Sequence, residues 1–373
     1  MQSVAQGWLA LELTNDPFLV GLVSAAGTLP VLLLSLGAGV LADRVDKLRL
    51  VMLSQSVLLV QATALWWFVW SGNVTIGWLL ALATLNGAAS AFDIPARQSF
   101  IVELVGREDL SSAIALNSSG FNLARIIGPG IAAAVIAAFG LAWCFALNVL
   151  SYLAVFTSLF RIRLPPRQRP TPAISPLEGL RQGLTYLVRT PSVSVLIRMV
   201  AVYSVFGIPY LVLMPVIARD VLRSDVTGYG YLLTAVGVGG FTGALALASA
   251  ASRLRRGKLL RVASLAFPVL LILFSFSRSI VLSAALLLLI GFTMILNNAL
   301  TNGLLQTIVL DELRGRVMSA YTWVFVGLGP LGALVAGSLA KVVGAADAIA
   351  LGAGVTLIYA VWMFARHPEL EEL

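Results

Sequence analysis

An arginine in the middle of a long apolar segment is the residue whose chemistry most needs an explanation. Arg125 lies about thirteen residues into an apolar segment that starts near Ser112, so a helix rising 1.5 Å per residue places it near the bilayer midplane. An unpaired charge there costs at least about 2.5–3.5 kcal/mol on insertion scales. We therefore expect Arg125 to face a central cavity or an acidic partner and to serve substrate or proton coupling. Asn122 shares its helix face. The alternative is a structural ion pair between helices that never contacts a substrate.

Polar side chains recur in two later apolar segments. Asn297 and Asn298 lie in the segment 280–301, and Tyr321 lies in the segment 317–340. Inside a membrane such groups either hydrogen bond neighbouring helices together or line a cavity. Both interpretations remain open, and the three residues are candidates for substrate or proton coupling.

A pair of opposite charges, Asp93 and Arg97, is separated by one helical turn with Pro95 between them. We expect Pro95 to end the fourth apolar helix, which places both charges near the membrane surface. Asp93 could then close a charge network with Arg44 or Lys47. A solvated helix end is the alternative. A proton-carrying role for Asp93 is the weaker hypothesis, because the residue would lie near water.

Several kinds of chemistry are excluded by what the sequence lacks. There is one His, His367 near the end of the chain, and one Cys, Cys144, so no Ser/His/Asp set and no conventional metal site can form. No Gly-x4-Gly-Lys-Ser/Thr motif is present. We expect no enzyme, no cofactor and no metal. Because the basic residues lie between apolar segments, we also expect no nucleic-acid binding.

Composition indicates a helical protein that crosses a membrane many times. Of 373 residues, 59% are hydrophobic and 11% charged, against about 45–50% and about 25% in soluble domains. The first apolar segment is too short for a bilayer core of about 30 Å, so we expect Met1 to lie inside a first helix truncated at its N-terminus. The twelve predicted segments are 1–14, 18–42, 50–70, 76–93, 112–138, 142–160, 193–217, 228–250, 259–277, 280–301, 317–340 and 345–365.

The basic residues are distributed very unevenly between alternate loops. Nineteen of the 25 Lys and Arg lie on one side, which predicts that this side and both termini are cytoplasmic. The proline- and arginine-rich stretch 161–192 is interpreted as a cytoplasmic linker between six-helix halves at 1–160 and 193–373. The nineteen are Arg44, Lys47, Arg49, Arg97, Arg107, Arg161, Arg163, Arg167, Arg169, Arg181, Arg189, Arg253, Arg255, Arg256, Lys258, Arg261, Arg314, Arg316 and Arg366.

The two halves contain a weak repeat around a Gly-Pro pair. Gly128-Pro129 lies in the fifth segment and Gly329-Pro330 in the eleventh, an offset of 201 residues. Proline removes a helical hydrogen bond and glycine permits close packing, so the pairs predict helix kinks with a shared mechanical role. Ordinary membrane-helix kinks are the alternative. Such internal duplication is typical of transporters whose halves rock about a central site.

A short turn between the second and third segments carries the most specific motif, GVLADRVDKLR from Gly39 to Arg49. It resembles the signature loop of the major facilitator superfamily, Gly-x-Leu-Ala-Asp-Arg-x-Gly-Arg-Lys. This chain matches at Gly39, Leu41, Ala42, Asp43 and Arg44, carries Asp46 where the family usually has Gly, and has Lys47 for the following Arg.

The resemblance implies a fold, a function and roles for the loop residues. The turn and the stretches around Asp93 and Arg125 are similar to the enterobactin-exporter and macrolide-efflux branch. This implies a twelve-helix monomer in the bacterial inner membrane that exports small organic molecules such as drugs, macrolides or siderophores by proton antiport. Asp43 would cap the eleventh helix, and the Asp93 network would act as an inner latch. Uptake or uniport, a non-transporting membrane protein and a membrane enzyme are the alternatives.

Overall fold

The computed structural model describes residues 1–106, 108–162, 185–186, 190–250 and 255–371. For thirteen of these residues, all in helices, only the backbone is described. They are Leu36, Val40, Ala42, Asp43, Arg44, Val102, Glu103, Ser111, Ser118, Asn122, Ala250, Asp311 and Glu312.

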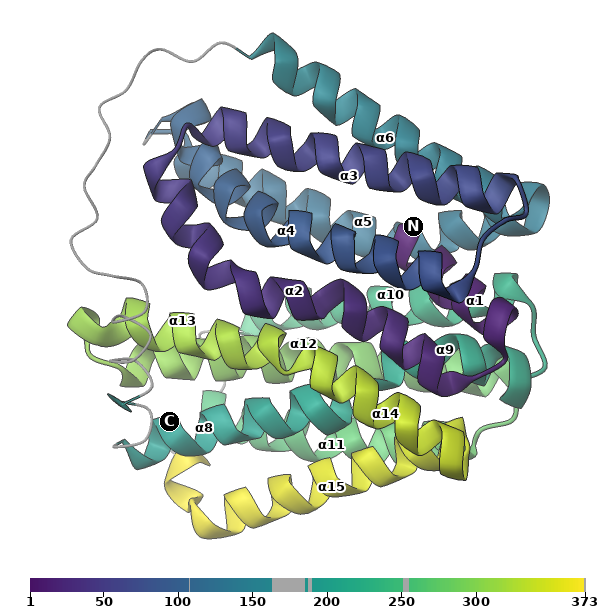
Figure 1. The fold of residues 1–373 in the computed structure, drawn as a ribbon. Helices are drawn as coiled ribbons and strands as arrows, with labels where there is room; N and C mark the ends of the chain where they lie inside the picture. The colour runs from purple at the N-terminus through teal and green to yellow at the C-terminus, as the bar shows by residue number, and fades with distance from the viewer. Residues whose placement is uncertain (107, 163–184, 187–189, 251–254, 372–373) are drawn as a thin grey trace.

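The first half of the chain forms a bundle of six helices, drawn from purple through blue to the teal of α6 in Figure 1. The predicted linker 161–192 falls largely outside the described residues. The helices are α1 (Gln2–Thr14), α2 (Pro17–Arg44), α3 (Lys47–Trp70), α4 (Ile76–Val105), α5 (Leu110–Phe139) and α6 (Leu141–Arg161).

The second half forms another bundle, in teal to yellow (Figure 1). Its first predicted segment is one helical run containing two π-helical turns, and its fifth is divided at Leu328. The elements are α8 (Pro191–Val202), η1 (Tyr203–Gly207), α9 (Tyr210–Val216), η2 (Ile217–Val221), α10 (Val226–Ala250), α11 (Arg256–Phe276), α12 (Ile280–Ile308), α13 (Asp311–Gly327), α14 (Gly329–Val343), α15 (Ala345–Arg366) and η3 (Pro368–Glu371).

Short polar residues and glycines define where the helices start and stop. Asp16 caps α2 by accepting a hydrogen bond from the Phe18 N–H at 2.9 Å, with proline at the first helical position. Gly140 joins α5 to α6 at φ 89°, and Gly344 joins α14 to α15 at φ 90°, a conformation that favours glycine. These two joints occupy equivalent places in the two bundles, so the repeat extends beyond the Gly-Pro pairs.

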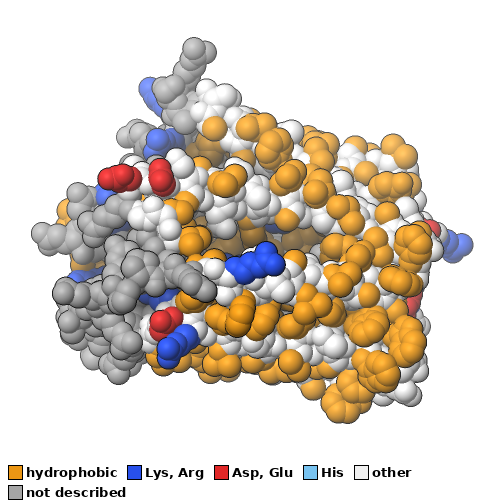
Figure 2. Space-filling view, turned by 90° about the horizontal axis from the view of Figure 1, so that it is seen from above, with side chains coloured by type: hydrophobic (Ala, Val, Ile, Leu, Met, Phe, Trp, Pro, Cys, Tyr) orange, Lys and Arg blue, Asp and Glu red, His pale blue; other side chains and the backbone are white. Residues whose placement is uncertain are grey.

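The helices present an apolar surface suited to lipid. Eleven helical runs among the described residues are long and apolar enough to cross a membrane. α1, with 13 residues, is about 20 Å long and is not one of them. Figure 2 shows apolar side chains over most of the visible wall and charged side chains mainly toward the two ends. The predicted all-α polytopic membrane fold is confirmed.

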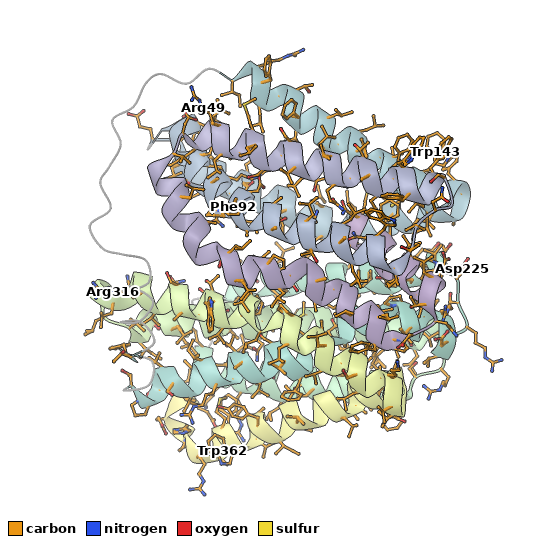
Figure 3. All side chains as sticks on the ribbon, in the orientation of Figure 1. Arg49, Phe92, Trp143, Asp225, Arg316 and Trp362 are labelled. Carbon is orange, nitrogen blue, oxygen red and sulfur yellow. The ribbon has the colours of Figure 1, made fainter. Side chains whose placement is uncertain are left out.

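The turns alternate between two ends of the molecule. We call these the α1–α2 end and the α2–α3 end, after the turns that they contain. Arg49 and Arg316 lie together at the α2–α3 end in Figure 3, whereas Trp143 and Asp225 lie at the α1–α2 end. The strongly basic loops of the described residues therefore share one end.

Two predicted helix ends lie too early in the chain, and only the first of them involves a proline. α4 does not end at Pro95 but continues to Val105, and α12 continues past residue 301 to Ile308. Asp93 and Arg97 therefore lie within α4 and not at a solvated helix end. A membrane helix tolerates an internal proline because leaving the helix would expose more unpaired backbone groups than the proline removes.

Candidate functional site

A cavity of about 590 Å³ lies between the two bundles. Helices α1, α2, α4 and α5 of the first bundle and α9, α10, α12 and α13 of the second contribute to its wall. Most of the wall is apolar. The polar side chains that line it are Ser3, Gln6, Ser24, Thr28, Asn86, Arg125, Tyr229 and Asn298.

Arg125 is the charged residue of this cavity wall. It projects from α5 toward the second bundle, because a Cβ added at Gly240 on α10 would lie 3.9 Å from Arg125 Nη2. The side chain is exposed, and within the described part of the chain it makes no hydrogen bond or ion pair. The structure therefore places Arg125 in a central cavity without an acidic partner. The Asn122 side chain lies outside the described residues.

The two neighbouring asparagines of α12 have different environments. Asn298 lines the cavity, and its Oδ1 accepts a hydrogen bond from the Tyr321 hydroxyl at 3.1 Å. Asn297 points into the second bundle instead, where it is 6% exposed and its Nδ2 donates to Ser264 Oγ at 2.7 Å. Adjacent residues on a helix point about 100° apart, so only one of the two reaches the cavity. Of the sequence-predicted coupling residues, Arg125 and Asn298 come together at the wall, Tyr321 supports Asn298, and Asn297 is separate.

Asp93 belongs to a buried polar cluster inside the first bundle. Its carboxylate is bound by Arg97 at 3.0 Å and accepts a hydrogen bond from Gln55 Nε2 on α3 at 2.8 Å. Asp93 is 8% exposed and is the one charged residue in the buried class among the described side chains. The sequence analysis did not single out Gln55, which is one of the few polar residues of α3.

The structure shows what two residues of the signature turn do locally. Asp46, at the position where the family usually has glycine, caps α3 by accepting a hydrogen bond from the Arg49 N–H at 2.9 Å. A Cβ added at Gly39 would meet no atom within 4 Å, so no described helix approaches closely at this glycine. The side chains of Asp43 and Arg44 lie outside the described residues. Lys47 lies in the first turn of α3 and Arg49 is exposed.

The Gly-Pro pairs are placed differently in the two bundles. α5 is continuous through Pro129, whereas the helix is interrupted at Leu328, just before Pro330. Neither Gly128 nor Gly329 meets another helix within 4 Å of an added Cβ. The close contacts come two and three residues later, at Gly130 and Gly332.

Glycines also mark where the two bundles touch. A Cβ at Gly21 of α2 would lie 2.5 Å from the Ala333 carbonyl oxygen of α14. A Cβ at Gly230 of α10 would lie 2.1 Å from Ala133 Cβ of α5. Toward the opposite end, an added Cβ at Gly39 or Gly120 meets open space. The bundles therefore approach most closely in the half of the molecule that contains the α1–α2 end.

Polar contacts join the bundles at the same end. Lys341 Nζ of α14 forms an ion pair with Asp16 Oδ2 at 2.6 Å, and Arg219 of η2 hydrogen bonds to Asn15. The Lys341 hydrogen bond holds the pKa of Asp16 below its ordinary value. Sequence reasoning overlooked these residues, although Asp16 before Pro17 is a recognisable helix-start signal.

Comparisons with known proteins agree with this architecture. A family model described as transmembrane secretion effector matches residues 1–373. The multidrug efflux pump Tap of Mycolicibacterium fortuitum is 30% identical, over 99% of this chain and 92% of that protein. The enterobactin exporter EntS of Shigella flexneri is 27% identical, over 95% and 82%.

Solved structures share the fold at low sequence identity. The nucleoside transporter NupG superposes with a TM-score of 0.77 at 12% identity, covering 97% of this chain and 93% of that one. A bacterial homologue of the lysosomal transporter Spinster gives 0.71 at 14%, covering 99% and 93%. The resemblance predicted from the turn motif is confirmed. With its whole length matched, the chain belongs to the transmembrane secretion effector family of the major facilitator superfamily, whose members are membrane transporters and not enzymes.

Proposed function

We propose that this transporter exports small organic molecules from the cytoplasm by alternating access, driven by proton influx. The observation that carries the proposal is a cavity lined by both bundles, whose closest mutual contacts lie toward one end. A substrate bound between two bundles changes its accessible side when the bundles rock about it.

The placement of charge supports an assignment of the two sides. The basic loops share the α2–α3 end, which the positive-inside rule assigns to the cytoplasm. The tight contacts and the Asp16–Lys341 pair then close the external side, so the cavity would take up its substrate from the cytoplasm. The names of the relatives, a multidrug efflux pump and an enterobactin exporter, favour export over uptake.

Asp93 is our candidate for the proton-coupling acid. Protonation would neutralise its carboxylate and weaken the ion pair with Arg97, which is itself 42% exposed at its side chain. A shift of α4 on protonation of Asp93 would pass to α2, because the two helices are in tight contact. A Cβ added at Gly87 of α4 would lie 2.3 Å from the Gly27 carbonyl oxygen of α2. α2 in turn contacts α14 at Gly21. A continuous set of packed helices thus links the acid to the bundle interface.

Everted membrane vesicles that contain the full chain test the proposal. We expect a pH gradient with an acidic vesicle lumen to drive the accumulation of a fluorescent dye inside the vesicles. A protonophore should abolish this accumulation. Asp93→Asn keeps a polar group for Gln55 but cannot titrate, so it should bind dye normally and lose the response to the gradient. Wild-type gradient dependence in Asp93→Asn would exclude its role. Transport of the dye out of the everted vesicles would support the uptake alternative.

A further inference from the structure

The chemistry of the cavity wall identifies a class of substrate. We propose that the cavity binds organic anions, with Arg125 as the counter-charge and the amide groups of Asn298 and Gln6 as hydrogen-bond donors. The inference rests on the proposed function, because it names the substrate class of the same cavity.

The charge of the wall is positive. Arg125 contributes one positive charge, and the described wall residues include no Asp or Glu. The guanidinium makes no ion pair or hydrogen bond within the described part of the chain. A bound carboxylate, phenolate or sulfonate would supply the missing partner, and guanidinium geometry suits such planar or multi-oxygen anions.

The neutral polar groups of the wall also present donors. The Tyr321 hydroxyl donates a hydrogen bond to the Asn298 amide oxygen. Asn298 Nδ2 has no hydrogen-bond partner within the described part of the chain. Gln6 Nε2 on α1 is buried and has no hydrogen-bond partner. Three side chains from both bundles therefore offer N–H groups to the cavity, and their complement is a ligand rich in acceptors.

A cation fits this wall poorly. It would approach Arg125 with like charge, and no described acidic residue lines the cavity to compensate. Asp93 does not line the cavity and its carboxylate is bound by Arg97. The volume of about 590 Å³ lies within the range of sites for drug-sized molecules. An interior-negative membrane potential would also favour the outward movement of an anion.

Two dyes with the same xanthene ring system and opposite charge test the proposal. The purified full chain in detergent is titrated with fluorescein, an anion, and with rhodamine 123, a cation, and binding is followed by fluorescence anisotropy. We expect the wild type to prefer fluorescein. Arg125→Gln should weaken fluorescein binding about 10- to 100-fold, the range for loss of a charge-assisted hydrogen bond, and leave rhodamine 123 unchanged or tighter.

Matched variants separate this effect from a general loss of structure. Arg125→Lys keeps the charge and should retain most of the anion preference. Arg198→Gln removes a charge from α8, outside the cavity wall, where the Arg198 Nε donates to the Ser194 carbonyl, and should change neither affinity. Equal losses for both dyes in Arg125→Gln, a wild-type preference for rhodamine 123, or no fluorescein binding would each overturn the proposal.

Binding and transport are measured separately, so the two proposals fail separately. Fluorescein binding that depends on Arg125, without movement of fluorescein into vesicles, supports the anion site and contradicts export. Energised export of rhodamine 123 that is insensitive to Arg125→Gln supports export and overturns the anion site.

Discussion

Adding one methyl group at Gly21 should push the two bundles apart at the α1–α2 end. In Gly21→Ala the new Cβ would lie 2.5 Å from the Ala333 carbonyl oxygen and 3.2 Å from Gly337 Cα. Ordinary contact between carbon and another heavy atom is about 3.5 Å, so the overlap with the carbonyl oxygen is about 1 Å. Both contacts are made by the backbone of α14, so no side chain can rotate away and the helices must separate.

The size of the effect follows from the cost of overpacking. Extra methyl groups in tightly packed sites cost about 1–3 kcal/mol. Applied to the conformation closed at the α1–α2 end, this cost lowers its population relative to the opposite conformation about 5- to 150-fold. The bundles touch here and the cavity lies between them, so the shift should open the cavity toward the α1–α2 end.

Spin labels on the turns of this end measure the separation directly. Cys144 is the single cysteine, so Cys144→Ala with Asn73→Cys and Ser279→Cys places one label on each bundle. Pulsed electron–electron double resonance should show that the fraction of molecules with a longer distance between the labels is larger in Gly21→Ala than in the wild type. Gly354→Ala on α15 is the matched control, because its added Cβ meets no atom within 4 Å. An unchanged distribution in Gly21→Ala, or the same shift in the control, would refute the reasoning.

Three further predictions concern the Asp16–Lys341 pair between the bundles and the Tyr321 contact at the cavity wall. Asp16→Asn removes the ion pair to Lys341 but keeps an oxygen to cap α2, so the same labels should separate less than in Gly21→Ala, since exposed pairs contribute about 0.2–1 kcal/mol. The depressed pKa of Asp16 keeps the carboxylate charged above its ordinary pKa of 3.8, and the pair is lost only as the pH falls through the lower value. In Asp93→Asn, which lacks the proposed proton-coupling acid, the distances at about pH 5 and about pH 8 should therefore coincide, and a difference would show that the Asp16–Lys341 pair is sensitive to pH in this range. Tyr321→Phe frees the Asn298 amide to turn, and we expect fluorescein affinity in the anisotropy assay to fall about 2- to 10-fold with rhodamine 123 unchanged. Equal losses for both dyes would show that Tyr321 acts only on stability.

The number and order of the apolar segments could be predicted because each signal is local, and their sidedness stays a prediction. A run of about 20 apolar residues is long enough to span a bilayer whatever its neighbours are. The turn from Gly39 to Arg49 identified the superfamily from adjacent residues alone. Arg125 was recognised as unusual because the cost of a charge in lipid depends on depth, which is read from its place in the segment.

The rotation of each helix about its own axis, and the residues at which two helices approach closely, were decided only by the tertiary structure. Gly39 and Gly128 carried the motifs, yet Gly21 and Gly230 make the contacts between the bundles. The sequence grouped Asn297 with Asn298, and packing separated them into a buried hydrogen bond and a cavity wall.

The physical reason is the uniform polarity of membrane helices. An amphipathic helix in water shows which face is buried, because its apolar side chains repeat every 3.6 residues. Here lipid-facing and protein-facing sides are both apolar, so composition and spacing determine that these helices cross the membrane and how many there are. Which face of each helix meets which neighbour, and hence that Arg125 and Asn298 share one cavity while Asp93 is buried elsewhere, is determined by packing between segments distant in sequence.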